Sequence, residues 1–353
     1  MEFLYSNLPP IRTGCPAFAD TFYSLMQNAA RMDIAVAYVT ADSIAQLKKT
    51  LEYNDNIKTL NLIIGMHYWD KFTKNEYNAA VSLNEYLLGE QRGEVRLVTP
   101  FRFHGKLYSY SNSEGAFAGI IGSDNLGSIV ESRMRIYEAS VLLREREYVA
   151  SMRDFIEKLS QKAAQNLDEC DISDFKERGT LLEGLENVEN VRPDQLAVLS
   201  FLHDVQFEIP LVKNGNVPEH SNLNVFFGKG REVAGSGVVQ PRHWYEAELI
   251  VPNTVTTLPG YPQKDTDTAV FDVITDDGWK FSCKVSGDYS KNLRSEDDLK
   301  ILGRWIKGRL ENAGVLQAGE LITPETFEKY GRDTLTMTKT TAPNLWYLDF
   351  GVR

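Results

Sequence analysis

The stretch HGKLYSYSNSEGAFAGIIGSDN, residues 104–125, holds two short polar motifs joined by strand-like sequence. The runs KLYSYS and AFAGII are separated by the turn-forming residues NSEG, which predicts a β-hairpin over residues 105–122. Because side chains alternate across a strand, His104 and Lys106 are expected to share one face. The first motif therefore predicts an imidazole and an ammonium group side by side.

The second motif follows the return strand of this hairpin. Ser123 and Asn125 are again two residues apart, and the turn that carries them is expected to lie beside the first pair. An ammonium and an amide can donate hydrogen bonds to phosphate oxygens, and a histidine can attack phosphorus or move a proton. The four side chains together predict a phosphodiester site that needs no metal or other cofactor.

Each motif alone is weak evidence for chemistry. A histidine beside a lysine can be an ordinary surface pair, and Gly-Ser-x-Asn can be an ordinary polar turn. Their occurrence on adjoining predicted strands favours the functional interpretation.

Composition limits the classes of protein to consider. The chain has 353 residues, 42% hydrophobic and 25% charged, which indicates a folded protein with room for two domains. No apolar run is long enough to cross a bilayer, and a cytoplasmic location without membrane contact is expected. Three cysteines far apart indicate reduced thiols and no structural zinc. The net charge of −11 argues against a uniformly basic nucleic-acid binder, although binding depends on where charges cluster.

The pattern of predicted secondary structure changes near the middle of the sequence. Strand-like runs alternate with helical stretches in the first part, which predicts an α/β sandwich with a mostly parallel sheet over residues 1–170. Residues 171–189 are expected to form a helical connector. Short β-branched and aromatic runs with Gly, Pro and Asn then predict a β-rich domain over residues 190–353, with one helix starting at a Ser295 cap and ending near Gly314.

The motifs HGK and GSDN resemble those of the phospholipase D superfamily, His-x-Lys followed by Gly-Ser-x-Asn. The resemblance covers about residues 1–165 and implies a phospholipase D-like sandwich with His104 as a nucleophile that forms a phosphohistidine. It further implies Lys106 and Asn125 as phosphate ligands, with Ser123 in support. The segment IYEASVLL resembles the next strand of that family and makes Glu138 the acid that orients the histidine. Glu131 is the weaker candidate for that role.

Two departures from the family pattern matter. An aspartate often stands where this chain has Ser111, so the outer part of the site differs. His-x-Lys occurs once, whereas the family builds its complete site from two halves. The resemblance therefore implies a two-fold homodimer through the first domain.

Positive charge gathers locally in the second half. Residues 284–309 carry seven basic and four acidic side chains, and the loop DYSKNLRS within them favours DNA binding. For Lys300, Arg304 and Lys307 on the predicted helix, the favoured interpretation is a solvated amphipathic face, with DNA contact as the alternative.

The second domain looks like the B3-type barrel that serves as the recognition domain of some type II restriction endonucleases. That resemblance covers about residues 190–353 and implies two DNA-binding arms, near 222–242 and 284–295. The candidate DNA-contacting residues are Asn222, Asn224, Lys229, Arg231, Arg242, Lys284, Tyr289, Lys291, Asn292 and Arg294.

The combined resemblance predicts a type II restriction endonuclease that cleaves double-stranded DNA without a metal and is paired with a cognate DNA methyltransferase. The alternatives are a DNA-binding regulator that keeps the nuclease fold for dimerisation, and an unspecific phospholipase D-like nuclease or phospholipase. His67 is expected to be structural at a strand end, although such a position can border an active site. His243 stays open between a DNA contact and a packed corner.

Overall fold

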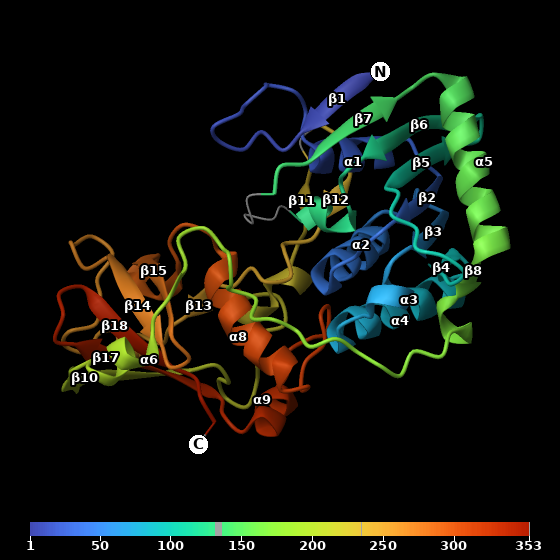
Figure 1. Cartoon of the computed structure of the whole chain (residues 1–353). Coiled ribbons are helices and arrows are strands. Elements are labelled where there is room, and N and C mark those ends of the chain that lie inside the picture. The colour runs from blue at the N-terminus through green and yellow to red at the C-terminus, as the bar shows by residue number, and fades with distance from the viewer. Residues whose placement is uncertain (131–135, 234, 353) are drawn as a thin grey trace. The chain divides into compact units, whose positions relative to one another are not determined.

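The computed structural model describes residues 1–130, 136–233 and 235–352, and the chain forms two compact units, each with its own sheet (Figure 1). Unit 1 consists of Met1–Arg178 and Gly230–Pro241. Unit 2 consists of Gly179–Lys229 and Arg242–Arg353. None of the described helices is long and apolar enough to span a membrane.

Unit 1 is built on an eight-stranded sheet with the order β1-β7-β6-β5-β2-β3-β4-β8. The strands are β1 (Glu2–Tyr5), β2 (Arg31–Val36), β3 (Thr59–Ile64), β4 (Gly93–Val98), β5 (Leu107–Asn112), β6 (Gly115–Gly122), β7 (Ala139–Leu143) and β8 (Ala164–Asn166). Only β2, β3 and β4 pair in parallel. The sheet is therefore mixed, which corrects the expectation of a mostly parallel one, because the β5–β6 hairpin and its neighbours pair antiparallel.

Helices cover both faces of this sheet (Figure 1). They are α1 (Phe18–Met26), α2 (Ala41–Tyr53), α3 (His67–Asp70), α4 (Lys74–Gly89) and α5 (Arg146–Ala163), with 3₁₀ turns at Leu126–Val130 and Leu167–Glu169. Phe18 and Phe22 of α1 pack on Tyr108, whereas its neighbour Leu107 packs with Met152 of α5. Since adjacent strand residues face opposite ways, α1 and α5 lie on opposite faces of β5. The hairpin that carries the motifs is thus fixed from both sides.

Unit 1 also contains a hairpin from far along the chain, β11 (Arg231–Glu232) and β12 (Val239–Gln240). The Asn54 amide at the end of α2 donates to the Val239 carbonyl at 2.6 Å and accepts from the Val239 N–H at 3.0 Å. Gln46 of the same helix donates to the Pro241 carbonyl at 3.4 Å. The β-rich region is therefore not one continuous stretch, which differs from the single range 190–353 expected from sequence.

The connector between the two regions contains turns and no helix over residues 171–189, so the expectation of a helical connector is wrong. Gly184 adopts a positive φ of 73°, a conformation that ends helical continuity. Leu182 and Leu185 are buried in this segment and anchor it without helical structure. The segment then enters β9 (Glu189–Asn190), which pairs with a strand of unit 2.

Unit 2 is built on a curled half-barrel sheet with the order β10-β17-β18-β14-β15-β16-β13. The strands are β10 (Phe201–Pro210), β13 (Leu249–Ile250), β14 (Val270–Thr275), β15 (Trp279–Ser286), β16 (Asn292–Ser295), β17 (Thr334–Thr340) and β18 (Leu345–Asp349). Alternate residues of β15 are buried, which gives the sheet an apolar inner face. The β-rich architecture expected from the short aromatic and β-branched runs is confirmed.

The helical elements of unit 2 are α6 (Pro193–Ala197), α7 (Asn253–Thr256), α8 (Lys300–Asn312) and α9 (Pro324–Tyr330), with 3₁₀ turns at Asn222–Phe227 and Asp288–Ser290. The helix α8 begins at Lys300, later than the expected Ser295 cap, because Ser295 belongs to β16. The Ser295 hydroxyl still accepts a hydrogen bond from the Leu302 N–H at 3.2 Å. It therefore satisfies a helical donor from a position outside the helix.

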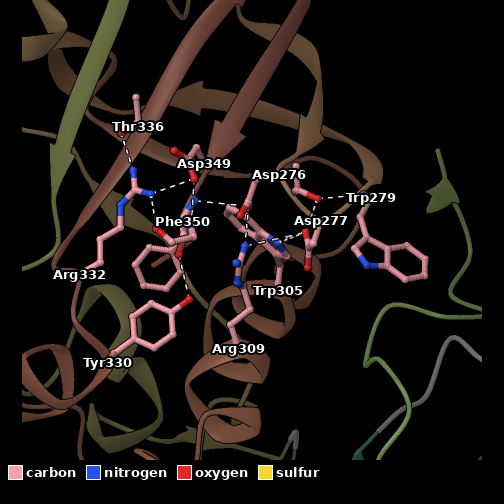
Figure 2. Close-up of polar contacts among 12 residues, drawn as sticks. Asp276, Asp277, Trp279, Trp305, Arg309, Tyr330, Arg332, Thr336, Asp349 and Phe350 are labelled. Carbon is pink, nitrogen blue, oxygen red and sulfur yellow. Dashed lines mark hydrogen bonds and ion pairs between the residues drawn. The ribbon is translucent and has the colours of Figure 1, made fainter. Parts of the chain in front are cut away.

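Side chains of α8 and α9 are tied to the sheet by buried and half-buried polar contacts (Figure 2). Arg309 pairs with Asp276 at 2.5 Å, and the Trp305 indole donates to Asp277 at 2.8 Å. The Tyr330 hydroxyl donates to the Phe350 carbonyl at 2.9 Å. These contacts join the β14–β15 turn and the end of β18 to the helices, so they fix the barrel against its helical layer.

The basic residues of α8 are not a solvated face, and that interpretation is wrong. Lys307 is fully buried, and Arg304 lies with its guanidinium 5.4 Å from the Tyr245 ring centroid. The Lys307 ammonium donates to the Trp244 carbonyl and lies 4.0 Å from the Trp244 ring centroid. Desolvation lowers the pKa of Lys307 to about 7, although Glu311 and Glu246 act to raise it.

This burial makes the stability of unit 2 depend on pH. The pKa of Lys307 is lower in the folded chain than in the unfolded chain, where it is about 10.4, so the unfolded chain binds more protons between these values. The free energy of unfolding should therefore rise with pH across this window. Lys307→Met should remove about 3 kcal/mol of that rise between about pH 7 and pH 9.5. Urea denaturation at both pH values measures it, with Lys300→Met as the control; an unchanged pH dependence would contradict the argument.

Candidate active site and DNA-binding residues

The β5–β6 hairpin predicted from sequence is confirmed, and it brings the two polar motifs together. The strands pair antiparallel from Leu107 opposite Ile121 to the turn at residues 113–114. The Gly122 N–H donates to the Lys106 carbonyl at 3.4 Å, just beyond the paired region. The open end of the hairpin therefore carries the first motif on one strand and the second motif on the other.

His104 and Lys106 are in direct contact. The Lys106 ammonium lies 2.9 Å from His104 Nδ1 and donates to the His104 carbonyl at 2.8 Å. An ammonium has no acceptor, so Nδ1 accepts, and a neutral His104 carries its proton on Nε2. Lys106 is buried, and desolvation lowers its pKa while Glu138 acts to raise it. His104 itself is exposed. The pair thus combines an accessible imidazole with a partly desolvated cation.

Asn125 is held by a residue that the sequence analysis did not identify. The Tyr38 N–H donates to Asn125 Oδ1 at 3.0 Å, so the amide nitrogen of Asn125 is turned away as a donor. The Tyr38 ring also lies edge-on to His104, with centroids 5.9 Å apart. Tyr38 follows the carboxyl end of β2, and side chains at the ends of parallel strands commonly border active sites. That position is the signal that could have identified it.

Ser123 joins the end of β6 to the start of β7. Its hydroxyl accepts from the Ala139 N–H at 3.0 Å and donates to the Ala139 carbonyl at 3.3 Å. The preceding Gly122 approaches β7 so closely that a Cβ there would lie 2.4 Å from the Cα of Ser140. Gly122 is thus needed because β6 and β7 approach too closely there for a side chain. The Ser123 hydroxyl joins the ends of the two strands through its hydrogen bonds to Ala139.

Asp124, between the two motif residues, is a structural carboxylate. It is buried, and the Ser140 hydroxyl donates to its Oδ2 at 2.5 Å. Desolvation raises the pKa of Asp124, and hydrogen bonds from Ser140 and Ser128 oppose that shift. Its role is to fix the loop that presents Ser123 and Asn125. Among the described residues, no group of three or more His, Cys, Asp or Glu side chains is arranged to hold a metal ion.

Glu138 lies half-buried, immediately before β7. Its backbone N–H donates to the Ser6 hydroxyl at 2.7 Å. Its carboxylate is near enough to act on the pKa of both Lys106 and Asp124, but within the described part of the chain no hydrogen bond joins it to His104. Glu131, the weaker candidate, lies outside the described residues.

His67 is a buried, neutral histidine behind Tyr38. Its Nε2 accepts from the Val39 N–H at 3.1 Å, its Nδ1 donates to the Lys71 carbonyl at 3.2 Å, and its ring stacks on Phe72. Desolvation lowers the pKa of His67. The residue therefore supports the loop beneath Tyr38, in agreement with a structural role.

Half of the candidate DNA-contacting residues lie on one hairpin of unit 2, formed by β15 and β16. Lys284 pairs in register with Arg294, and Ser286 with Asn292. Tyr289 is 68% exposed at the turn, with a positive φ of 58°. Lys284 also contacts Glu296 at 2.9 Å. Over residues 284–294, this hairpin carries three cations, one amide and an exposed aromatic ring. They belong to Lys284, Lys291, Arg294, Asn292 and Tyr289.

The other candidates are dispersed. Lys229 and Arg231 are exposed, but Arg231 belongs to the hairpin packed on α2 in unit 1. Arg242 makes a two-pronged ion pair with Glu246. The hydrogen bond to Glu246 and the charges of Glu246 and Glu248 raise the pKa of Arg242, although burial acts to lower it. His243 Nδ1 accepts from the Tyr245 N–H at 3.0 Å, as expected of a packed corner.

Asn222 and Asn224 are structural, which corrects their place among the DNA contacts. Asn222 Oδ1 accepts from the Ile250 N–H at 3.0 Å, and Asn224 is fully buried and bonded in both directions to the backbone of Ile322. Both amide side chains thus satisfy buried or half-buried backbone groups. The composition of the loop suggested exposure, but the loop folds inward.

Two family models match the chain. Residues 17–172 match the NgoFVII restriction endonuclease N-terminal PLD domain, and residues 198–341 match the NgoFVII C-terminal B3-like DNA-binding domain. The chain belongs to the NgoFVII-type restriction endonucleases. The phospholipase D and B3 resemblances drawn from the motifs are confirmed, and the protein is a DNA hydrolase with a B3-like DNA-binding domain.

Solved structures with similarity to this NgoFVII-type chain include Nuc, a phospholipase D family member, and NucT. Nuc from Salmonella typhimurium is 15% identical, with 47% of this chain and 95% of that chain covered and a TM-score of 0.34. NucT from Helicobacter pylori is also 15% identical, with 47% and 99% covered and a TM-score of 0.30. No curated protein matches the chain.

The B3-like unit of this NgoFVII-type enzyme also carries a hollow of about 590 Å³ on β10, β17 and β18. Gln206, Glu208, Thr336 and Asp349 line it, and Glu208 accepts from the Thr336 hydroxyl at 2.9 Å. None of the candidate DNA-contacting residues lines this hollow. Its two carboxylates, Glu208 and Asp349, outnumber its one arginine, Arg332, which is paired with Asp349 at 2.8 Å. The β15–β16 hairpin is therefore the better candidate for DNA contact.

Proposed function

We propose that this protein is a type II restriction endonuclease that cleaves double-stranded DNA at a specific sequence through a phosphohistidine on His104. The observation that carries the proposal is the direct contact of His104 with a buried Lys106 at the open end of the hairpin. A nitrogen of His104 would attack the phosphorus and displace one ester oxygen of the DNA strand. Water would then attack the phosphohistidine, which returns the histidine and leaves a phosphomonoester end.

The proposed roles of Lys106 and Asn125 follow from the hydrogen-bond donors that their side chains carry. Lys106 and the Asn125 amide nitrogen would hold the non-bridging oxygens, where negative charge must be stabilised. In the structure Nδ1 accepts from Lys106, so attack by Nε2 would require Lys106 to move from Nδ1 to the phosphate. The imidazole proton would then lie on Nδ1 and be held by an acceptor. Glu138 is the acid that fits this acceptor role, because its charge already acts on Lys106. Ser123 would support the loop.

Recognition is assigned to the β15–β16 hairpin of the B3-like domain, with Lys229, Arg231 and Arg242 as further contacts. The proposed division of the chain is a nuclease domain over residues 1–170, a connector over 171–189 and a recognition domain over 190–353. The hairpin within residues 230–241 of this last range packs in unit 1.

A cognate DNA methyltransferase would protect the same sequence in the host. Incubation with long duplex DNA tests the proposal: discrete fragments support it, a smear indicates an unspecific nuclease, and retarded intact DNA indicates a regulator.

A homodimer would complete the site, because each chain supplies one His-x-Lys. The sheet face that α5 covers at β5 continues over β6, β7 and β1 as an apolar surface for a second copy: Phe3, Val141 and Ile121 pair in register across it. Phe3 is 53% exposed and Ile121 43% exposed. Exposed apolar side chains that share a sheet face commonly mark an interface.

Phe3→Asp should dissociate this dimer, because it places a carboxylate in the apolar row. We expect the variant to sediment as a monomer and to lose cleavage by at least about tenfold, since each half-site lacks its partner. Leu88→Asp is the matched control, since Leu88 is a similarly exposed side chain on α4. A monomeric variant that cuts at the wild-type rate would refute the half-site argument.

His104→Ala should abolish cleavage by at least about a thousandfold while specific DNA binding changes by less than about twofold. The nucleophile is lost, but the residues assigned to recognition are untouched. Cleavage assays and electrophoretic mobility shifts with the cognate duplex provide the two measurements. If binding fell as far as cutting in a folded variant, catalysis and recognition would not be separable as proposed.

Cleavage should persist in excess EDTA, because a histidine nucleophile with Lys and Asn donors replaces a metal-activated hydroxide. An adduct on His104 should be trapped by denaturation without acid, since phosphohistidine is acid-labile. Peptide mass spectrometry after quenching locates the adduct. Loss of cutting in EDTA that added Mg²⁺ restores would show the mechanism to be wrong even within this fold.

A further inference from the structure

Two exposed aromatic side chains of α3 have no part in the chemistry described above. Tyr68 and Trp69 belong to α3, and they are 40% and 41% exposed. Their rings meet edge to face, with centroids 5.7 Å apart. Single exposed aromatic residues are common, but here two adjoin each other.

A chain of contacts joins this pair to His104. The Arg102 guanidinium lies 5.5 Å from the Trp69 ring centroid, and Arg102 contacts Asp70 at 3.4 Å. Asp70 in turn accepts from the Tyr38 hydroxyl at 2.6 Å, and the Tyr38 ring lies edge-on to His104. Trp69 is therefore fixed relative to the nucleophile by named side chains.

The electrostatics of this chain hold Arg102 beside the ring. The hydrogen bond from Tyr38 is the main cause that lowers the pKa of Asp70, and Arg102 adds to it. Asp70 is thus a carboxylate at neutral pH that keeps the guanidinium in place. The same hydrogen bond raises the pKa of Tyr38 and keeps its hydroxyl as the donor. The arrangement is preorganised, with an aromatic ring and a cation presented together.

We infer that Trp69, with Arg102 and Tyr68, stacks on an unpaired nucleobase next to the phosphate under attack. The inference rests on the proposed function, since it takes His104 as the point of attack. Aromatic rings with nearby arginines bind unstacked bases through stacking and charge, with little sequence preference. Such a contact would hold the DNA strand locally open while recognition elsewhere reads the duplex.

A second copy of the chain is the competing occupant of this surface, and the charge distribution disfavours it. Arg102 is 59% exposed beside the rings, and its partner Asp70 is already shared with Tyr38. The apolar row of Phe3, Val141 and Ile121 contains no such cation. The cation of Arg102 beside the Trp69 ring suits a nucleotide, which offers a phosphate and a base. The uncharged row of Phe3, Val141 and Ile121 suits a protein partner.

Binding measurements that need no cleavage test the inference. The full chain with His104→Ala is titrated with oligothymidylate of about ten nucleotides and with an abasic phosphodiester of the same length. We expect the thymidylate to bind about tenfold more tightly, because only it offers bases for stacking. Trp69→Ala should abolish that preference, Trp69→Phe should retain most of it, and Leu88→Ala should leave it unchanged.

Three results would overturn the inference. They are equal affinity of the two oligomers for the parent, an unchanged preference in Trp69→Ala, or a shift of Trp69→Ala toward monomer in sedimentation, which would assign the surface to a second copy. Because the assay uses uncleaved single strands, its failure leaves the role of His104 untouched. Conversely, a failure of His104 in cleavage assays would not alter the preference for bases.

Discussion

Antiparallel pairing of β5 with β6 is the constraint on which the candidate active site depends. The pairing places the backbone of Lys106 opposite Gly122, so a histidine and lysine on one strand meet a serine and asparagine after the other. Register matters because a shift of one residue would turn every side chain to the opposite face. Packing of α1 on one face and α5 on the other fixes that register, since Tyr108 and Leu107 are each buried against a different helix.

The second layer of the site comes from the neighbouring strand ends. Tyr38 holds Asn125 through its backbone and touches both His104 and Asp70 through its side chain. His67 supports the loop from below in a neutral form. One buried residue thus keeps the backbone of the Tyr38 segment in place, and that backbone orients the proposed phosphate ligand. The hairpin carries the candidate catalytic residues, but residues that follow β2 and β3 hold Asn125 in its orientation.

Local sequence patterns predicted the parts of this molecule that depend on near neighbours. Alternation and turn residues sufficed for the hairpin, and motif spacing sufficed for the group of His104, Lys106, Ser123 and Asn125. Contacts between distant segments were beyond reach: Tyr38 lies far from Asn125 in sequence, and Val239 meets Asn54 across an even longer separation. The amides of Asn222 and Asn224, like the cation of Lys307, were taken for surface groups because polarity alone does not report burial. Only the tertiary structure supplies the backbone partners that make such burial tolerable.

The charges of the proposed recognition surface explain how an acidic protein can bind DNA selectively. Lys284 contacts Glu296, Arg294 lies 3.8 Å from Glu248, and Arg242 is paired with Glu246. In the proposed complex, each cation would exchange a carboxylate for a phosphate or a base edge. The half-exposed pairs of Lys284 and Arg294 contribute only about 0–1 kcal/mol each, so their exchange costs little where the new contact is good. The Glu246 carboxylate is buried, so breaking its pair with Arg242 costs more. Where the sequence offers no good contact, the carboxylates repel the phosphates, and weak binding to unrelated DNA follows. The net charge of −11 thereby favours discrimination between sites over unspecific attraction.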